Sequence, residues 1–171
     1  MRKCLPVILG SLLAGFAMAQ ETPQLGEPVD ADALAAIDYT VLPDGDGLPE
    51  GSGTAVEGAA VFRQYCIACH GEGGAGGIND TLVGGHDSLA GDRPQKTVGS
   101  YWPYATTLFD YVRRAMPLQA PGTLTNDEIY AVSAYLLHLN GIIAEDVPMT
   151  AETLPRVKMP NRDGFSWAYS P

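Results

Sequence analysis

Five consecutive residues, Cys66-Ile67-Ala68-Cys69-His70, restrict what this chain can fold into more than any other feature. Two thiols separated by two residues can each add to one of the two vinyl groups of a haem, and the imidazole of the next residue then reaches the iron from the same side. The motif predicts one covalently attached haem c, with Cys66 and Cys69 as attachment points and His70 as an axial ligand of the iron. The fold must therefore form a pocket around a large, rigid macrocycle.

Two other functions of these cysteines fit the sequence less well. A structural zinc site needs four ligands and usually a second cysteine pair, but the chain has one further cysteine, Cys4, close to its N-terminus. A redox-active dithiol of the thioredoxin type would need a βαβ setting, which this sequence lacks. Neither alternative accounts for the histidine directly after Cys69.

The second axial ligand must reach the opposite face of the haem, and a methionine sulfur is the usual donor in electron carriers. The candidates are Met116, Met149 and Met159. Met116 lies between two predicted helices, where a loop stiffened by Pro117 can carry its sulfur across the haem face, so we predict His70 and Met116 as the metal ligands. The alternatives for this ligand position are Met159, a histidine or a vacant site. The ordinary role of a methionine is core packing, which suits Met149 and Met159.

The N-terminal residues 1–19 have the features of a secretory signal peptide. Arg2 and Lys3 supply the positive charge, residues 5–16 are apolar, and the small residues at 17–19 form a cleavage pattern. We expect cleavage after Ala19 and export to the periplasm. The alternative is a retained membrane anchor, but the apolar stretch is shorter than the roughly 20 residues that a spanning helix needs, and we expect no membrane span in the mature chain.

Loss of the signal peptide changes the charge of the chain. Of the ten Lys and Arg residues, two lie in the signal, which leaves eight basic against twenty acidic residues and a net charge of −12. Such a charge disfavours nucleic acid as a partner and favours docking on a basic face of another protein. Solubility alone is the other explanation of this charge.

The mature sequence divides into an N-terminal arm at 20–53, a helical domain at 54–141 and a C-terminal arm at 142–171. Both arms are rich in Pro and Gly, with a short helix expected around 31–37. We expect the arms to dock a partner; the alternative is that they cover apolar surface of the central domain.

Three main helices are expected in the central domain, which makes it an all-α domain. The first begins at Thr54, the second spans 106–115 and the third spans 126–140; residues 71–100 are rich in glycine and are expected to form a loop around the haem. Two pairs have the spacing of a capping box, Thr54 with Glu57 and Thr125 with Glu128. The third helix carries one apolar stripe, made of Ile129, Val132, Leu136 and Leu139.

Several polar residues near these helices have two interpretations. Arg113 and Arg114 complement the dipole of the second helix, or one of them hydrogen-bonds a haem propionate. Trp102 is a further propionate candidate through its indole N–H. We expect His86 to be solvated and His138 to complement the end of the third helix.

From residue 54 to residue 141 the chain resembles class I cytochromes c. This resemblance implies a fold of three main helices around one covalently bound haem, with irregular N- and C-terminal arms. It also implies a close crossing of the first and last helices, with Gly58 and Phe62 facing Val132 and Tyr135.

A more specific resemblance rests on three unusual strings: VLPDGDGLPEGSGT at 41–54, VGSYWPYATTLFDYVRRAMP at 98–117 and VKMPNRDGF at 157–165. They are similar to the cytochrome subunit of the Sox-pathway sulfur dehydrogenase and to the cytochrome partners of molybdenum sulfite dehydrogenases. The resemblance implies His70 and Met116 as the axial pair, a molybdenum-cofactor sulfite or sulfur dehydrogenase subunit as electron donor, and a downstream cytochrome or oxidase as acceptor. The sulfur-dehydrogenase cytochrome typically has two haem domains, whereas this chain has a single Cys-x-x-Cys-His.

The sequence therefore predicts a periplasmic electron-transfer protein that is not itself an enzyme. The first alternative is a free-standing electron shuttle to an oxidase or reductase, for which the two long arms have little use. The second is a small haem peroxidase or ligand-binding haem protein, which would need an open or displaceable sixth iron site and is disfavoured by Met116 followed by Pro117.

Overall fold

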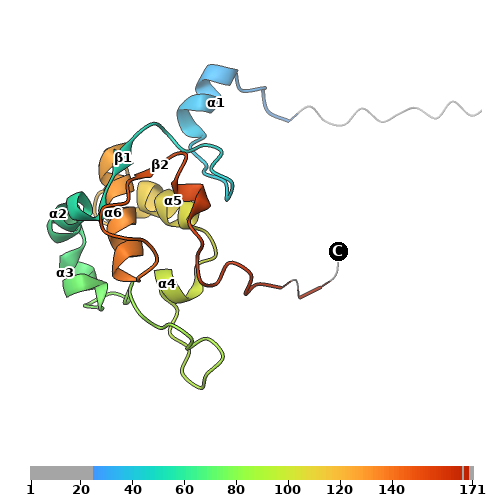
Figure 1. Cartoon of the computed structure of the whole chain (residues 1–171). Coiled ribbons are helices and arrows are strands. Elements are labelled where there is room, and N and C mark those ends of the chain that lie inside the picture. Colours follow the sequence, from blue (N-terminus) through green and yellow to red (C-terminus); the bar gives the residue numbers. More distant parts are fainter. Residues whose placement is uncertain (1–24, 167, 170–171) are drawn as a thin grey trace, which may run out of the picture. The chain divides into compact units, whose positions relative to one another are not determined.

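The computed structural model of the chain describes residues 25–166 and 168–169 (Figure 1). The expected signal peptide at 1–19 lies outside these residues. The chain forms two units that divide after Ala36. At the division lies α1, Ala31–Ile37, which is the short helix expected from the sequence. Asp30 begins it, because its carboxylate accepts a hydrogen bond from the Ala33 N–H at 2.8 Å.

Three helices dominate the second unit, as the sequence predicts: α2 (Ala55–Tyr65), α5 (Ala105–Ala115) and α6 (Asn126–Leu139). Both predicted capping boxes are present, with Thr54 and Thr125 as the capping residues. At each of these N-termini the threonine hydroxyl accepts a hydrogen bond from a backbone N–H of the first turn. The side chain of the glutamate three residues later accepts a hydrogen bond from the threonine N–H. In the described part of the chain, no helix is long and apolar enough to cross a membrane.

The close crossing of α2 and α6 is confirmed, and Ala131 joins the residues that meet there. A Cβ at Gly58 would overlap the carbonyl group of Ala131 and come within 2.8 Å of Tyr135 Cβ, so the missing side chain lets the two backbones approach. The ring of Phe62 packs against Tyr135, with the ring centres 5.4 Å apart. Val132 and Phe62 both line a cavity beside the crossing.

Helix α6 is more deeply buried than its predicted stripe suggests. Tyr130, Ser133, Ala134 and Leu137 are also buried, whereas Leu139 is only partly so. The reason is that α6 lies at the centre of the unit, with α2, α5 and β1 packed around it (Figure 1). A stripe predicts one covered face, but neighbours from distant parts of the sequence cover the others.

The shorter elements include three that the sequence did not predict as regular structure. The region between α2 and α5 contains α3 (Ile67–His70), the 3₁₀ turn η1 (Glu72–Gly74) and α4 (Val98–Tyr101), joined by long irregular stretches.

The C-terminal arm is built into the core. Its strand β2 (Met149–Thr150) pairs antiparallel with β1 (Ser52–Gly53), and a 3₁₀ turn, η2 (Leu154–Arg156), follows. Met149, Leu154 and Met159 are buried in the same apolar core as the helices. This part of the arm therefore covers apolar surface of the central domain, which was the alternative to a purely docking role.

Candidate haem site

The corner between α2 and α3 brings the three residues of the attachment motif together. Cys66 is the C-cap of α2 and the N-cap of α3, and the N–H groups of Cys69 and His70 donate hydrogen bonds to its carbonyl at 3.1 and 3.0 Å. This single helical turn places both thiols and the imidazole on the wall of one cavity. Both thiols are free, so neither is used in a disulfide.

A hydrogen bond to the backbone fixes the orientation of the His70 ring. Its Nδ1 lies 2.9 Å from the carbonyl oxygen of Asp80. A carbonyl only accepts hydrogen bonds, so Nδ1 carries the proton, and Nε2 keeps its lone pair for a metal. The loop that presents Asp80 is itself held by the N–H of Asn79, which donates to the Cys69 carbonyl at 2.9 Å. The sequence reasoning did not find this contact, because a backbone carbonyl leaves no signature in residue type.

Met116 is the only one of the three candidate methionines that shares a cavity with His70. It follows α5 directly, is partly exposed, and lines two adjoining cavities together with His70. Met149 and Met159 are only 1% and 2% exposed and line neither cavity. The geometry therefore favours Met116 over Met149 and Met159 as the second axial ligand.

The walls between His70 and Met116 are apolar. They are formed by side chains from α2, α5, α6 and the loop after η1, among them Phe62, Leu82, Val112, Val132 and Leu136. Burial, and next the nearby Cys69, raise the pKa of the Cys66 thiol to about 11, so this sulfur is uncharged at neutral pH. Two thiols, an imidazole and a thioether around an apolar slot are a donor set that fits a covalently attached haem.

The second of the two cavities, of about 210 Å³, has a different set of residues at its far end: Asp80, Thr81, Lys96, Thr97, Trp102 and Tyr111. Of the sequence candidates for a haem propionate, Trp102 lies here and the two arginines do not. Sequence analysis had not identified Lys96, which precedes α4 and has no distinguishing motif around it.

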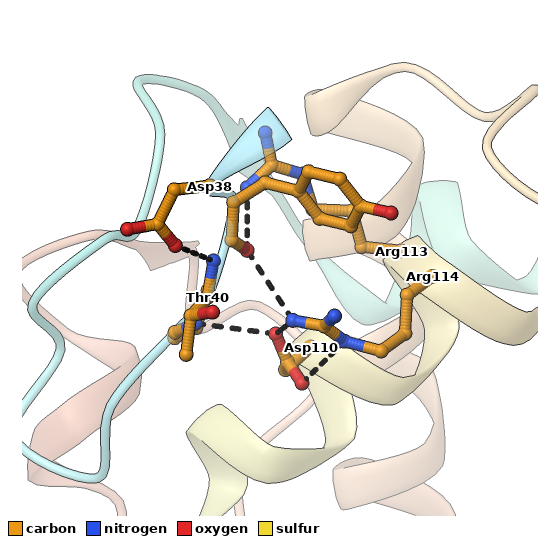
Figure 2. A network of polar contacts seen from close by, with 7 residues as sticks. Asp38, Thr40, Asp110, Arg113 and Arg114 are labelled. Atoms are coloured by element: carbon orange, nitrogen blue, oxygen red, sulfur yellow. Dashed lines mark hydrogen bonds and ion pairs between the residues drawn. The ribbon is translucent and has the colours of Figure 1, made fainter. Parts of the chain in front are cut away.

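Arg113 and Arg114 take part in a separate polar cluster (Figure 2). The Asp110 carboxylate accepts from Arg114 Nε at 2.8 Å and from the Val41 N–H at 3.2 Å. Both guanidinium groups lie over the Tyr39 ring, 5.4 and 5.0 Å from its centre. The arginines thus hold the chain segment around residue 40 against α5, and neither lines the cavities that contain His70.

The remaining histidines lie away from the cavities around Met116. His138, near the end of α6, has Nδ1 3.3 Å from the Ile143 carbonyl, and His86 is exposed on the loop before α4.

Comparison with known proteins agrees with this geometry. The sequence pattern of the cytochrome c family matches residues 55–140, half of the chain. The chain belongs to the cytochrome c family, its fold is that of a class I cytochrome c, and it therefore carries a covalently bound haem c with iron.

Two individual proteins are informative. The crystal structure of the sulfane dehydrogenase SoxCD from Paracoccus pantotrophus contains a chain that is 42% identical to this one, with a TM-score of 0.79, over 85% of this chain and 72% of that one. The thiosulfate dehydrogenase of Psychrobacter arcticus is 25% identical over 122 residues, which are 71% of this chain and 34% of that protein. This chain thus spans about a third of the length of that relative.

Proposed function

We propose that this chain is a periplasmic monohaem cytochrome c that transfers single electrons as the haem subunit of a sulfite or sulfur dehydrogenase. It accepts electrons from a molybdenum-cofactor subunit that oxidises the sulfur compound, and passes them to a downstream cytochrome or oxidase. The chain itself is not catalytic in this proposal.

The observation that carries the proposal is the extent of the likeness to the sulfane dehydrogenase chain. The family pattern alone covers half of this chain, whereas that likeness covers 85% of it at 42% identity. It therefore extends beyond the haem domain into the arms. Arms of this length favour a dedicated subunit over a free-standing shuttle, which needs only the haem domain.

Each residue of the site has a definite task in this function. The bound haem supplies one-electron chemistry, because its iron is stable in both the ferric and the ferrous state. Cys66 and Cys69 hold the group covalently, and His70 is kept in the ligating tautomer by the Asp80 carbonyl. The Met116 sulfur, a soft donor, favours the ferrous state, and the apolar walls exclude water and favour it further.

The side of the cavity that bears the thiols is also the side open to a partner. Leu118 and Tyr65, which line it, are 62% and 37% exposed. Gln119, which also lines this cavity, has its amide nitrogen 3.9 Å from the Cys69 sulfur. We propose that Leu118 and Tyr65 contact the electron donor, because an apolar contact this close to the thioether bonds keeps the electron path short.

The test mixes the oxidised protein with a purified molybdenum sulfite dehydrogenase subunit and sulfite, and follows the absorbance of the ferrous haem. We expect one electron per chain, and about tenfold slower reduction of Leu118→Glu, the loss of roughly 1.4 kcal/mol of interface energy. Val56→Glu is the matched control, because Val56 is 60% exposed but does not line the cavity. A small chemical reductant should reduce all three proteins equally fast.

The proposal fails if the chain is readily reduced by the chemical reductant but not by the molybdenum subunit with sulfite, thiosulfate or a sulfane donor. That result would favour the shuttle.

A further inference from the structure

We propose that Lys96, with Trp102 beside it, binds the propionate carboxylates of the haem and that its positive charge raises the reduction potential of this carrier. The inference rests on the haem site and the electron-transfer function proposed above. It adds the residues that tune the reduction potential of the haem.

The two cavities around His70 are two ends of one cleft. They share His70, Leu82, Val112, Met116 and Leu136. The first end contains Cys66 and Cys69, and the second contains Lys96 and Trp102; neither pair lines the other end. The cleft therefore has a thiol end and a second end, lined by different residues, that carries a cation and an indole N–H.

The chemistry of the haem fixes its direction in such a cleft. The two vinyl groups lie toward one side of the macrocycle and the two propionates toward the other. If the vinyl carbons are bonded to Cys66 and Cys69, the propionates are directed toward the end with Lys96 and Trp102. A carboxylate in a partly apolar cavity is stabilised there only when it meets donors or a positive charge.

The residues at this end differ in whether their polar groups are free to bind a propionate. The Thr97 hydroxyl already donates to the Gly84 carbonyl at 2.6 Å. Asp80 carries a negative side chain, and its carbonyl is taken by His70. Among the residues that line this end, Lys96 is the one lysine or arginine, and the described residues provide no acceptor for the Trp102 indole N–H or the Tyr111 hydroxyl. The Lys96 ammonium, the Trp102 indole N–H and the Tyr111 hydroxyl are therefore available to a propionate, and Lys96 is the one of the three that brings a positive charge.

Residues of the C-terminal arm pack against Tyr101, whose ring contacts Lys96. The Lys96 ammonium lies 5.0 Å from the centre of the Tyr101 ring, a cation–π distance. Tyr101 in turn meets the ring of Phe165 edge to face at 5.3 Å, and its carbonyl accepts from Asn161 Nδ2 at 2.7 Å. Phe165 and Asn161 thus position Tyr101, and through Tyr101 they position the Lys96 ammonium. By this route the C-terminal arm affects the reduction potential of the haem.

The charge of Lys96 should affect the iron in one direction. Reduction adds an electron, so a nearby cation stabilises the ferrous state relative to the ferric state, and it also cancels part of the negative charge of the propionates. Removal of this charge should lower the reduction potential. Because Lys96 is exposed, solvent screens the interaction and the shift should be modest.

The test compares Lys96→Met with Lys158→Met in the full haem-loaded protein. Lys158 is an exposed lysine of the arm that lines neither end of the cleft, so its loss is the same change in net charge. We expect Lys96→Met to lower the midpoint potential and to shift the propionate bending band in the resonance Raman spectrum. Lys158→Met and Lys96→Arg should leave both close to the wild-type values.

Two further variants separate the contributions of neighbouring groups. Trp102→Phe should shift the propionate band with a smaller change in potential, because it removes a donor and no charge. Phe165→Ala should give part of the Lys96→Met shift. The proposal is overturned if Lys96→Met, with covalent haem and the Met116 charge-transfer band intact, changes the potential no more than Lys158→Met. Such a result would leave the proposed function standing, whereas wild-type protein without covalent haem would refute the site itself.

Discussion

At the level of single residues, the methionines at 116, 149 and 159 carry the same thioether group but lie in two different environments. Met149 and Met159 are enclosed in the core, where a thioether fills space. Met116 stands at the end of α5 on the wall of the cleft, where its sulfur is free to meet a metal. The dipeptides Met116-Pro117 and Met159-Pro160 look alike in the sequence, so only their surroundings tell them apart.

Replacement of each methionine by alanine should therefore give different results. In Met116→Ala the weak sulfur-to-iron charge-transfer band of the ferric protein should disappear and the potential should fall. In Met159→Ala the band should persist, while the free energy of unfolding drops by about 2–5 kcal/mol, the usual cost of truncating a buried methionine. Absorption spectra and denaturant titrations measure the two effects. A band that survives in Met116→Ala and vanishes in Met159→Ala would assign the ligand to the C-terminal arm.

At the level of elements, the crossing of α2 and α6 sets the shape of the cleft. Phe62 of α2, its C-cap Cys66, and Val132 and Leu136 of α6 line its thiol end, so the separation of the two helices fixes the width available to the haem. That separation depends on Gly58, where an added Cβ would overlap the Ala131 carbonyl.

Gly58→Ala should destabilise the protein, although intrinsic helix propensity alone would favour alanine by about 1 kcal/mol. The added methyl group must push the helices apart, and overpacking of this kind costs about 1–3 kcal/mol. Thermal unfolding of the haem-loaded protein measures the change. Ala60→Gly, at an exposed position of the same helix, is the control and should cost only about 1 kcal/mol. Equal or greater stability of Gly58→Ala would show that the two backbones do not need this close approach.

At the level of the whole second unit, both arms are joined to the haem domain by specific contacts. The Tyr130 hydroxyl of α6 donates to the Pro49 carbonyl at 2.9 Å, and the Arg113–Arg114 cluster holds the segment around Tyr39 (Figure 2). On the C-terminal side, β2 pairs with β1, and buried side chains follow it. The arms thus complete the domain, and a role in docking stays a prediction for their exposed parts.

A chain that ends at residue 145 should be much less stable than the full mature chain. It lacks the buried side chains of Met149, Leu154 and Met159, each of which contributes roughly 1.5–3 kcal/mol on burial, so about 5 kcal/mol or more is lost. A loss of this size approaches the whole stability of a typical domain. The control chain ends at residue 165, because the described residues beyond it are exposed. Thermal unfolding distinguishes the two, and equal melting temperatures for both chains would refute a structural role of residues 146–165.

Local signals in the sequence determined a large share of this protein. The attachment motif, the two capping boxes and the turn residues act through neighbours a few positions away, so they predicted the haem, the ends of the three main helices and α1. The identity of the axial methionine was predicted from its position between two helices, and the cleft geometry supports that choice.

The tertiary structure decided what depends on contacts between distant segments. It buried α6 on faces outside its apolar stripe, made Ala131 the partner of Gly58, and drew residues 149–159 into the core. It also directed Arg113 and Arg114 to Tyr39 and Asp110, and brought Lys96 to the cleft. Side-chain type and spacing do not encode these outcomes, because a long charged or apolar side chain can serve many partners, and only the packed chain determines which one it meets.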